Sequence, residues 1–144
     1  MVGVLTHLYM ATYDRAYLDR VNALLQAFSG ELGNRYAAYG AYLNGLDSLL
    51  LAIQIVIVGP RSNAKTQELI SAVHGRALPA ASLLVVEPDQ KLPENHPAFG
   101  KTMQGGVPTA YICQQQTCGV PVTSAVALSQ MLQMPVQTAV AGRA

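Results

Sequence analysis

The first half of the chain carries apolar residues at helical spacing. Between Arg15 and Phe28 an apolar stripe recurs every three or four residues, and it comprises Tyr17, Val21, Leu24, Leu25 and Phe28. This spacing predicts a helix with one buried face. A second stripe predicts a helix over residues 37–50, and the apolar segment 1–12 predicts a helix before both. Successive amphipathic helices form a helical hairpin, which needs a further layer to cover its apolar faces.

The apolar runs of the second half are shorter and favour strands. The β-branched run 53–58 ends in a Gly-Pro pair and predicts a buried strand. A helix is expected over residues 64–74, with Ser62 or Asn63 as its cap, and a second strand over residues 82–87. Strand, helix and strand at this spacing predict a βαβ unit with parallel strands.

A long connection and a hairpin follow the βαβ unit. Residues 88–108 contain four prolines and three glycines, so we expect a long loop that is either functional or mobile. The segments 109–113 and 118–120 predict a strand hairpin that is closed by residues 114–117. A last helix is predicted over residues 125–134.

These elements predict an α/β chain in two parts and a tail. We expect a helical hairpin in residues 1–52, a small α/β appendage in residues 53–136, and a loose tail in residues 137–144. The first helix begins without Ser, Thr, Asp or Asn as a cap. We therefore expect the helical part to continue a larger structure.

The composition points to a partner and excludes two classes of partner. Of the 144 residues, only 12% are charged, where about 25% is usual for a globular domain. With a net charge of +1 the chain has no field to attract nucleic acid or an anionic membrane. A free monomer with so little charge would expose apolar surface. We expect either the remainder of a parent protein or a second copy to cover it.

Cys113 and Cys118 fall on the two arms of the predicted hairpin. Opposed positions have Cα atoms about 4.5–5.5 Å apart, within reach of a disulfide. The Cys-x4-Cys spacing differs from the Cys-x-x-Cys of thiol oxidoreductases. We favour structural thiols in a reducing cytoplasm, with a disulfide or redox pair as the alternative. A metal ion would need two more ligands, and His7, His74 and His96 do not lie at ligand spacing. We expect no metal and no cofactor.

The loop after the first strand is a candidate anion site. Arg61, Ser62 and Asn63 lie between a parallel strand and a helix N-terminus, where α/β sheets bind anions. The loop has neither the Gly-x-Gly-x-x-Gly pattern nor a Walker lysine motif. We favour a plain turn and keep the three residues as anion-binding candidates.

Two further groups of residues are candidates for chemistry. Glu87, Asp89 and Glu94 lie near His96 in the sequence, and such groups can serve acid–base catalysis. No periodicity fixes a second group beside them, so we favour a solvated loop and assign no catalytic residue. The helical-spaced Tyr36, Tyr39 and Tyr42 suit either a sugar-binding surface or the core, and we favour the core.

Several short motifs in order resemble a known family. They are Tyr17–Arg20, Ala27–Gly30, Ile55–Gly59, Val107–Cys113 and Cys118–Thr123. Together they resemble the C-terminal end of the thioredoxin-domain proteins of the spermatogenesis-associated type. The resemblance implies a thioredoxin-like domain and a barrel of helical hairpins, similar to that of sugar epimerases and six-hairpin glycosidases. Neither is contained in this chain, which matches the last hairpin and a small α/β appendage.

The resemblance and the composition lead to one expectation of function. We expect a non-catalytic C-terminal module that completes a larger helical-barrel protein. One alternative is a contribution to a carbohydrate-active, epimerase-like site. The other is a small thiol redox switch through Cys113 and Cys118.

Overall fold

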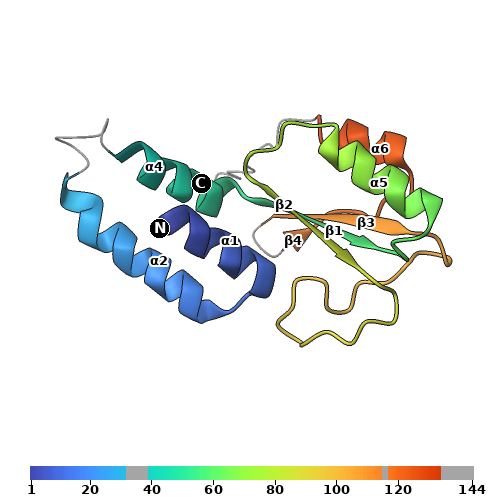
Figure 1. Ribbon diagram of the computed structural model, residues 1–144, viewed down its shortest axis with the longest axis horizontal. Coiled ribbons are helices and arrows are strands. Elements are labelled where there is room, and N and C mark those ends of the chain that lie inside the picture. Colours follow the sequence, from blue (N-terminus) through green and yellow to red (C-terminus); the bar gives the residue numbers. More distant parts are fainter. Residues whose placement is uncertain (32–38, 115–116, 134–144) are drawn as a thin grey trace, which may run out of the picture.

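A computed structural model describes residues 1–31, 39–114 and 117–133. A layer of helices stands beside a four-stranded sheet (Figure 1). The helical layer comprises α1 (Val2–Thr12), α2 (Arg15–Phe28), the 3-10 turn η1 (Ser29–Glu31) and α4 (Gly40–Leu51). The rest comprises β1 (Ile53–Val58), α5 (Ala64–His74), β2 (Ala81–Val86), β3 (Thr109–Gln114), β4 (Thr117–Cys118) and α6 (Ala125–Met131). The predicted α/β class, with helices before the sheet, is confirmed.

The sheet has the order β2-β1-β3-β4. β1 pairs in parallel with β2, so the predicted βαβ unit is confirmed, and it pairs antiparallel with β3. Because β1 has a partner on each side, every residue of its apolar run can be buried in the sheet. Ile55, Val56 and Ile57 are all 0% exposed.

The two faces of the sheet are covered in different ways. On one face α5 and α6 lie side by side, and Ile55 and Ile57 pack there with Leu69 and Leu128 (Figure 1). The opposite face carries Val56 and other alternate residues, as the period of two in a strand requires. Loop residues cover this face, with Ala98, Leu92 and Met103 packed against it.

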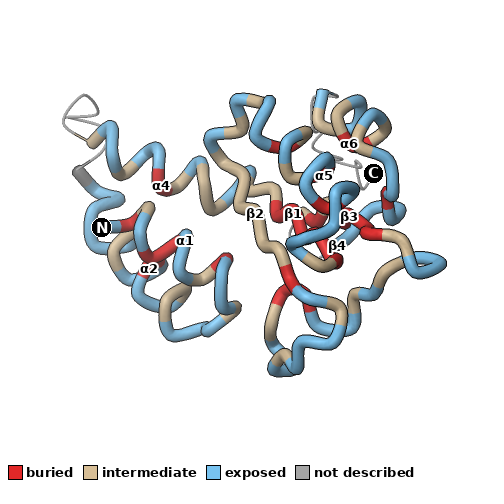
Figure 2. Tube along the Cα trace, turned by 45° about the vertical axis from the view of Figure 1, so that its right-hand side comes forward, coloured by how far each residue is buried: buried red, intermediate tan, exposed pale blue. Residues whose placement is uncertain are grey.

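The helical layer has a much smaller core. α1 contacts both α2 and α4, so the predicted hairpin is in fact a three-helix layer (Figure 1). Its buried cluster consists of Val2, Leu5 and Val21. Figure 2 shows this contrast, since buried segments concentrate in the strands while the helices on the other side are mostly half-buried or exposed. These helices therefore keep apolar surface that the sheet does not cover.

Some predictions fall outside the described residues. They concern Tyr36, the start of the helix predicted at residue 37, the middle of the turn 114–117 and the tail 137–144. The division into units 1–52 and 53–136 stays a prediction. Among the described helices, none combines the length and the apolar character that crossing a bilayer requires.

Candidate functional site

A cleft lies at the junction between the helical layer and the sheet. We call it the junction cleft, and it has a volume of about 740 Å³. Its walls come from the α1–α2 corner, the start of β1, the loop after β2 and the β3–β4 hairpin. The residues that line it include Tyr9, Tyr13, Asp14, Arg15, Leu18, Gln54, Glu94, Asn95, His96, Lys101, Cys113 and Cys118. A hollow of about 250 Å³ shares several of these residues and reaches inward to Met10 and Leu49. The cleft thus joins four segments that are far apart in the sequence.

Gln54 is the polar centre of the cleft wall. It is the one polar residue inside the apolar run of β1, and it is buried. Its side-chain amide donates to the carbonyl of Met10 at 2.5 Å, and its carbonyl accepts the hydroxyl of Tyr13 at 3.0 Å. The Met10 carbonyl belongs to the last turn of α1, where carbonyls lack partners within the helix. Gln54 therefore caps α1 and joins the helical layer to the sheet.

Tyr13 links α1 to α2 in an uncommon backbone conformation. Its φ of 53° places a tyrosine in the left-handed region, which β-carbon sterics disfavour outside glycine. Tyr9 packs against its ring edge-on, with the ring centroids 5.5 Å apart. Burial, and to a lesser extent Tyr9, raises the pKa of Tyr13, so its phenol stays a hydrogen-bond donor. The next residue, Asp14, caps α2 by accepting from the backbone N–H of Ala16.

The loop wall of the cleft is an ordered structure rather than a loose connection. The Tyr111 hydroxyl donates to the carbonyl of Thr102 at 2.6 Å and so anchors the loop to the sheet. The Lys101 ammonium donates to the carbonyl of Pro97 at 2.6 Å and lies 5.9 Å from the centre of the Tyr111 ring. These contacts hold the loop against the sheet, and whether the loop is functional or mobile stays a prediction.

His96 lies in this loop, in surroundings that favour its neutral form. Its Nδ1 accepts the backbone N–H of Ala98 at 3.1 Å, so the proton of the neutral ring lies on Nε2. Burial, and then the charge of Lys101, lowers the pKa of His96, and burial also lowers the pKa of Lys101. The cleft therefore holds an imidazole whose lowered pKa favours the neutral form, with its proton on Nε2.

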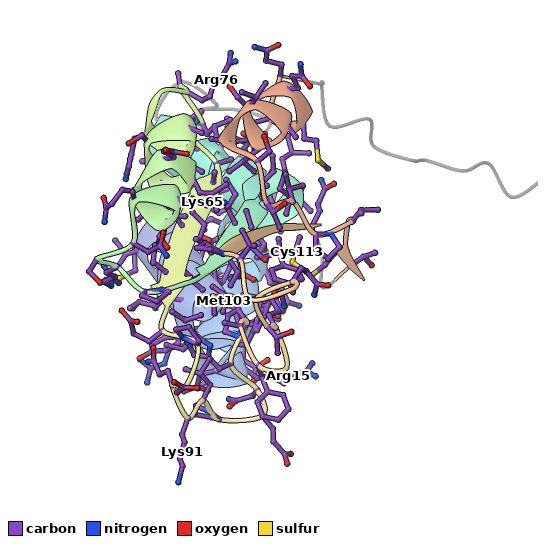
Figure 3. All side chains as sticks on the ribbon, turned by 90° about the vertical axis from the view of Figure 1, so that its right-hand side faces the viewer. Arg15, Lys65, Arg76, Lys91, Met103 and Cys113 are labelled. Carbon is purple, nitrogen blue, oxygen red and sulfur yellow. A yellow bond between two sulfur atoms is a disulfide. The ribbon has the colours of Figure 1, made fainter. Side chains whose placement is uncertain are left out.

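The two cysteines form a disulfide (Figure 3). Both residues line the junction cleft. Cys113 on β3 lies opposite Cys118 on β4, and the backbone N–H of Gly119 donates to the carbonyl of Ile112. This pattern makes the cysteines a non-hydrogen-bonded pair, in which opposed side chains lie closest. The preference for separate structural thiols was wrong, because the hairpin register brings the two side chains together.

The predicted anion-binding residues lie away from the junction cleft. Asn63 caps α5 by accepting the backbone N–H of Lys65, which confirms one of the two predicted caps. The backbone N–H of Arg61 donates to the Glu87 carboxylate, and the Arg61 guanidinium donates to the carbonyl of Val85. A carboxylate of the chain itself thus occupies the position an anion would take. Anion binding by Arg61, Ser62 and Asn63 stays a prediction.

The structure separates the acidic residues of the long loop into two groups. Glu94 joins His96 at the junction cleft. Glu87 instead holds the Arg61 turn, and Asp89 is exposed beside it. The only carboxylate that the loop brings to the same cleft as His96, within the described residues, is therefore Glu94.

Tyr39, just before α4, and Tyr42 on α4 contribute to packing within the helical layer. Tyr42 donates to the carbonyl of Leu25 at 2.7 Å, and Tyr39 and Tyr42 form an aromatic cluster with Phe28 of α2. These contacts agree with the core interpretation. A sugar-binding role for these rings stays a prediction.

Comparison with known proteins gives one relative. The chain resembles human spermatogenesis-associated protein 20. The two are 29% identical over 133 residues, which cover 89% of this chain and 17% of that protein. No family model and no solved structure matches the chain. The match supports a distant relationship to a small part of a much longer polypeptide.

Sequence reasoning singled out His96 and the two cysteines of the junction cleft but missed Tyr13, Gln54 and Lys101. Gln54 carried a signal, since it is the single polar break in the apolar run from Leu49 to Gly59. Tyr13 and Lys101 carried no signal in the sequence. Tyr13 contacts Gln54, 41 residues away, and Lys101 contacts Tyr111, ten residues away, and only the fold creates these contacts. No group of three or more His, Cys, Asp or Glu side chains able to hold a metal ion occurs within residues 1–31, 39–114 and 117–133.

Proposed function

We propose that this chain is a non-catalytic structural module of a larger protein, and that its helical layer docks on further helices of that protein. In the finer form of the proposal, it is the C-terminal part of a protein with a thioredoxin-like domain and a barrel of helical hairpins. The match to 17% of a longer relative supports the coarser statement. The family resemblance of the short motifs supports the finer one.

One observation carries the proposal: the apolar surface that α1 and α4 leave exposed. On α1, Val4 and Leu8 are 62% and 39% exposed, and their spacing of four places them on one face. On α4, Leu43 and Leu51 are also exposed. A face of this kind on a free monomer usually marks an interaction site.

The scarcity of charged residues on the two helices supports the same proposal. α1 contains no Asp, Glu, Lys or Arg, and Asp47 is the single charged residue of α4. A helix that faces water normally carries a charged face opposite its buried stripe. α1 and α4 lack such a face, which is the composition expected for helices packed between other helices. We propose helices as the partner because a helical layer is completed by ridges and grooves of the same kind.

The test is a measurement of exposed apolar surface on the purified full chain. We expect a monomer that binds a hydrophobic dye, and we expect Leu8→Glu and Leu43→Glu together to reduce this binding several-fold because charge covers the face. The matched control is Val126→Glu, an exposed apolar residue on α6 away from the helical layer.

Two results would contradict the proposal. A monomer without dye binding would show that the helical face is compatible with water. A stable dimer that Leu8→Glu dissociates would show that a second copy covers the face, in place of a larger protein. Circular dichroism of each variant checks that its helices are retained.

A further inference from the structure

We propose that the Cys113–Cys118 disulfide is a thiol–disulfide exchange site, where a small zwitterionic thiol enters the junction cleft and attacks Cys118. This inference is independent of the docking function. Two observations motivate it. The disulfide lines a cleft of about 740 Å³, which is large enough to admit a small molecule. The environments of its two sulfur-bearing residues also differ sharply.

The difference in burial selects which sulfur is attacked. Cys113 is 2% exposed on β3, and its neighbours in the core are Val56 and Tyr111. Cys118 is exposed on the two-residue edge strand β4. Exchange requires the incoming thiolate to reach a sulfur directly, so access decides the site. Cys118 is therefore the electrophilic sulfur and Cys113 is the leaving group.

The reaction balances with thiols alone. The incoming thiol loses its proton, its sulfur bonds to Sγ of Cys118, and the Cys113–Cys118 bond breaks with its electron pair on Cys113. The proton ends on the Cys113 thiol, which gives a mixed disulfide on Cys118. A second thiol of the same kind then attacks this mixed disulfide, which releases the oxidised small molecule and leaves the Cys118 thiol. Two thiols are oxidised to one disulfide while the protein disulfide is reduced to two thiols.

The fold permits this change without loss of the sheet. β3 pairs with β1 over six residues, so Cys113 is held whether or not the disulfide is intact. Beyond β4, the chain is tied to β3 again by two hydrogen bonds between Ala110 and Val122. With the disulfide open, the pairing of β3 with β1 and the two hydrogen bonds to Val122 remain.

The charges of the cleft suggest the class of thiol. Arg15 and Lys101 place positive charge on its walls, and Asp14 and Glu94 place negative charge there. Both charges of a zwitterion can find a partner in such a site, while a thiol with only one sign of charge meets repulsion as well as attraction. Reduced glutathione is the probe for this class, and mercaptoethanol is the uncharged comparison.

The primary test uses the unmodified full chain. After brief exposure to reduced glutathione and acid quenching, peptide mapping by mass spectrometry should find glutathione on Cys118 and a free thiol on Cys113. An adduct mainly on Cys113 would overturn the proposal. Absence of any adduct while circular dichroism shows a folded chain would overturn it as well. Glutathione should also react faster than mercaptoethanol at equal thiolate concentration. An equal or slower reaction would contradict the preference of the cleft for zwitterionic thiols.

Two pairs of variants sharpen the test. Cys113→Ser leaves the exposed Cys118, and Cys118→Ser leaves the buried Cys113. Oxidised glutathione should modify the first at least about tenfold faster than the second, because exchange depends on access to the sulfur. Leu18→Trp narrows the cleft and should slow exchange in the chain that keeps both cysteines, while Ser71→Trp on α5, outside the cleft, should not. Equal reaction rates within either pair of variants would contradict the proposal that exchange takes place at Cys118 in the junction cleft.

Discussion

The sheet and the helical layer bury their residues to very different extents. In β1, five of six residues are buried, and both faces of the sheet carry a core. In α2 only Val21 is buried, and in α4 only Gly45. The sheet is thus a complete layered unit, since it has helices on one face and an ordered loop on the other. Within the described residues, no second layer covers the outer face of the helical layer.

The helices on the two sides show the same contrast in charge. α5 covers one face of the sheet and carries Lys65 and Glu68 on its exposed side. α1 carries no charged residue, although Val4 and Leu8 are exposed. In this structure an exposed helix face is therefore not always a face adapted to water.

The largest effect is expected in the core of the sheet. Ile57→Ala should lower the free energy of unfolding by about 2–5 kcal/mol, because it leaves a cavity in a fully buried cluster. Leu24→Ala in the half-buried helical layer should lower it by clearly less. Urea unfolding of both variants is the measurement. Equal losses would show that the helical core is as tightly packed as the sheet.

The next effect concerns the crossing of α1 and α4. A Cβ on Gly45 would lie 2.8 Å from the backbone nitrogen of Gly3 and 2.7 Å from the side chain of Val2. Gly45→Ala should therefore destabilise the helical layer by about 1–3 kcal/mol through overpacking. Gly40→Ala, where no atom lies within 4 Å, is the control and should be neutral or stabilising.

Hydrogen exchange decides whether this loss is local. We expect the amides of α1 and α4 to lose protection in Gly45→Ala while those of β1 and β3 keep theirs, because the sheet has its own core. Uniform loss of protection would show that the two regions unfold as one cooperative unit.

A smaller effect is expected at the hydrogen bonds that join the regions. Gln54→Leu leaves the Tyr13 hydroxyl and the Met10 carbonyl without their partner, which should cost about 1–2 kcal/mol. Tyr13→Phe should cost less, because Gln54 keeps its bond to Met10. The double variant should lose less than the sum of the single losses, since the shared bond is removed only once. Additive losses would contradict a direct coupling.

The smallest effect is a pH dependence from His96. Its folded pKa lies below the ordinary value of about 6.5, so the unfolded chain binds more protons in this range. Stability should therefore be fully present above about pH 6.5 and fall as the pH decreases through the folded pKa. His96→Gln should flatten this dependence, and His74→Gln on α5 is the matched histidine control. If the free energy of unfolding changes with pH equally in both variants and in the unmodified chain, His96 does not cause the dependence.

The sequence predicted the elements better than it predicted the site. The run 53–58 and the stripe around Leu69 and Val73 became a buried strand and a buried helix face, because period and burial coincide there. The periodicity also predicts the apolar stripe of α2. It does not predict how far this stripe is buried, because periodicity shows which face is apolar and not what covers it. The sequence leaves the Cys113–Cys118 disulfide as the less favoured alternative, since the local spacing leaves the register of the hairpin open.

By itself, the sequence determined the order and type of the elements and the scarcity of charge on α1 and α4. These follow from properties of neighbouring residues, which act over three or four positions. Only the tertiary structure decided that Tyr13, Gln54, His96 and the disulfide line one cleft. Their meeting depends on strand pairing and on how the helical layer rests beside the sheet, and such long-range contacts leave no local pattern in the chain.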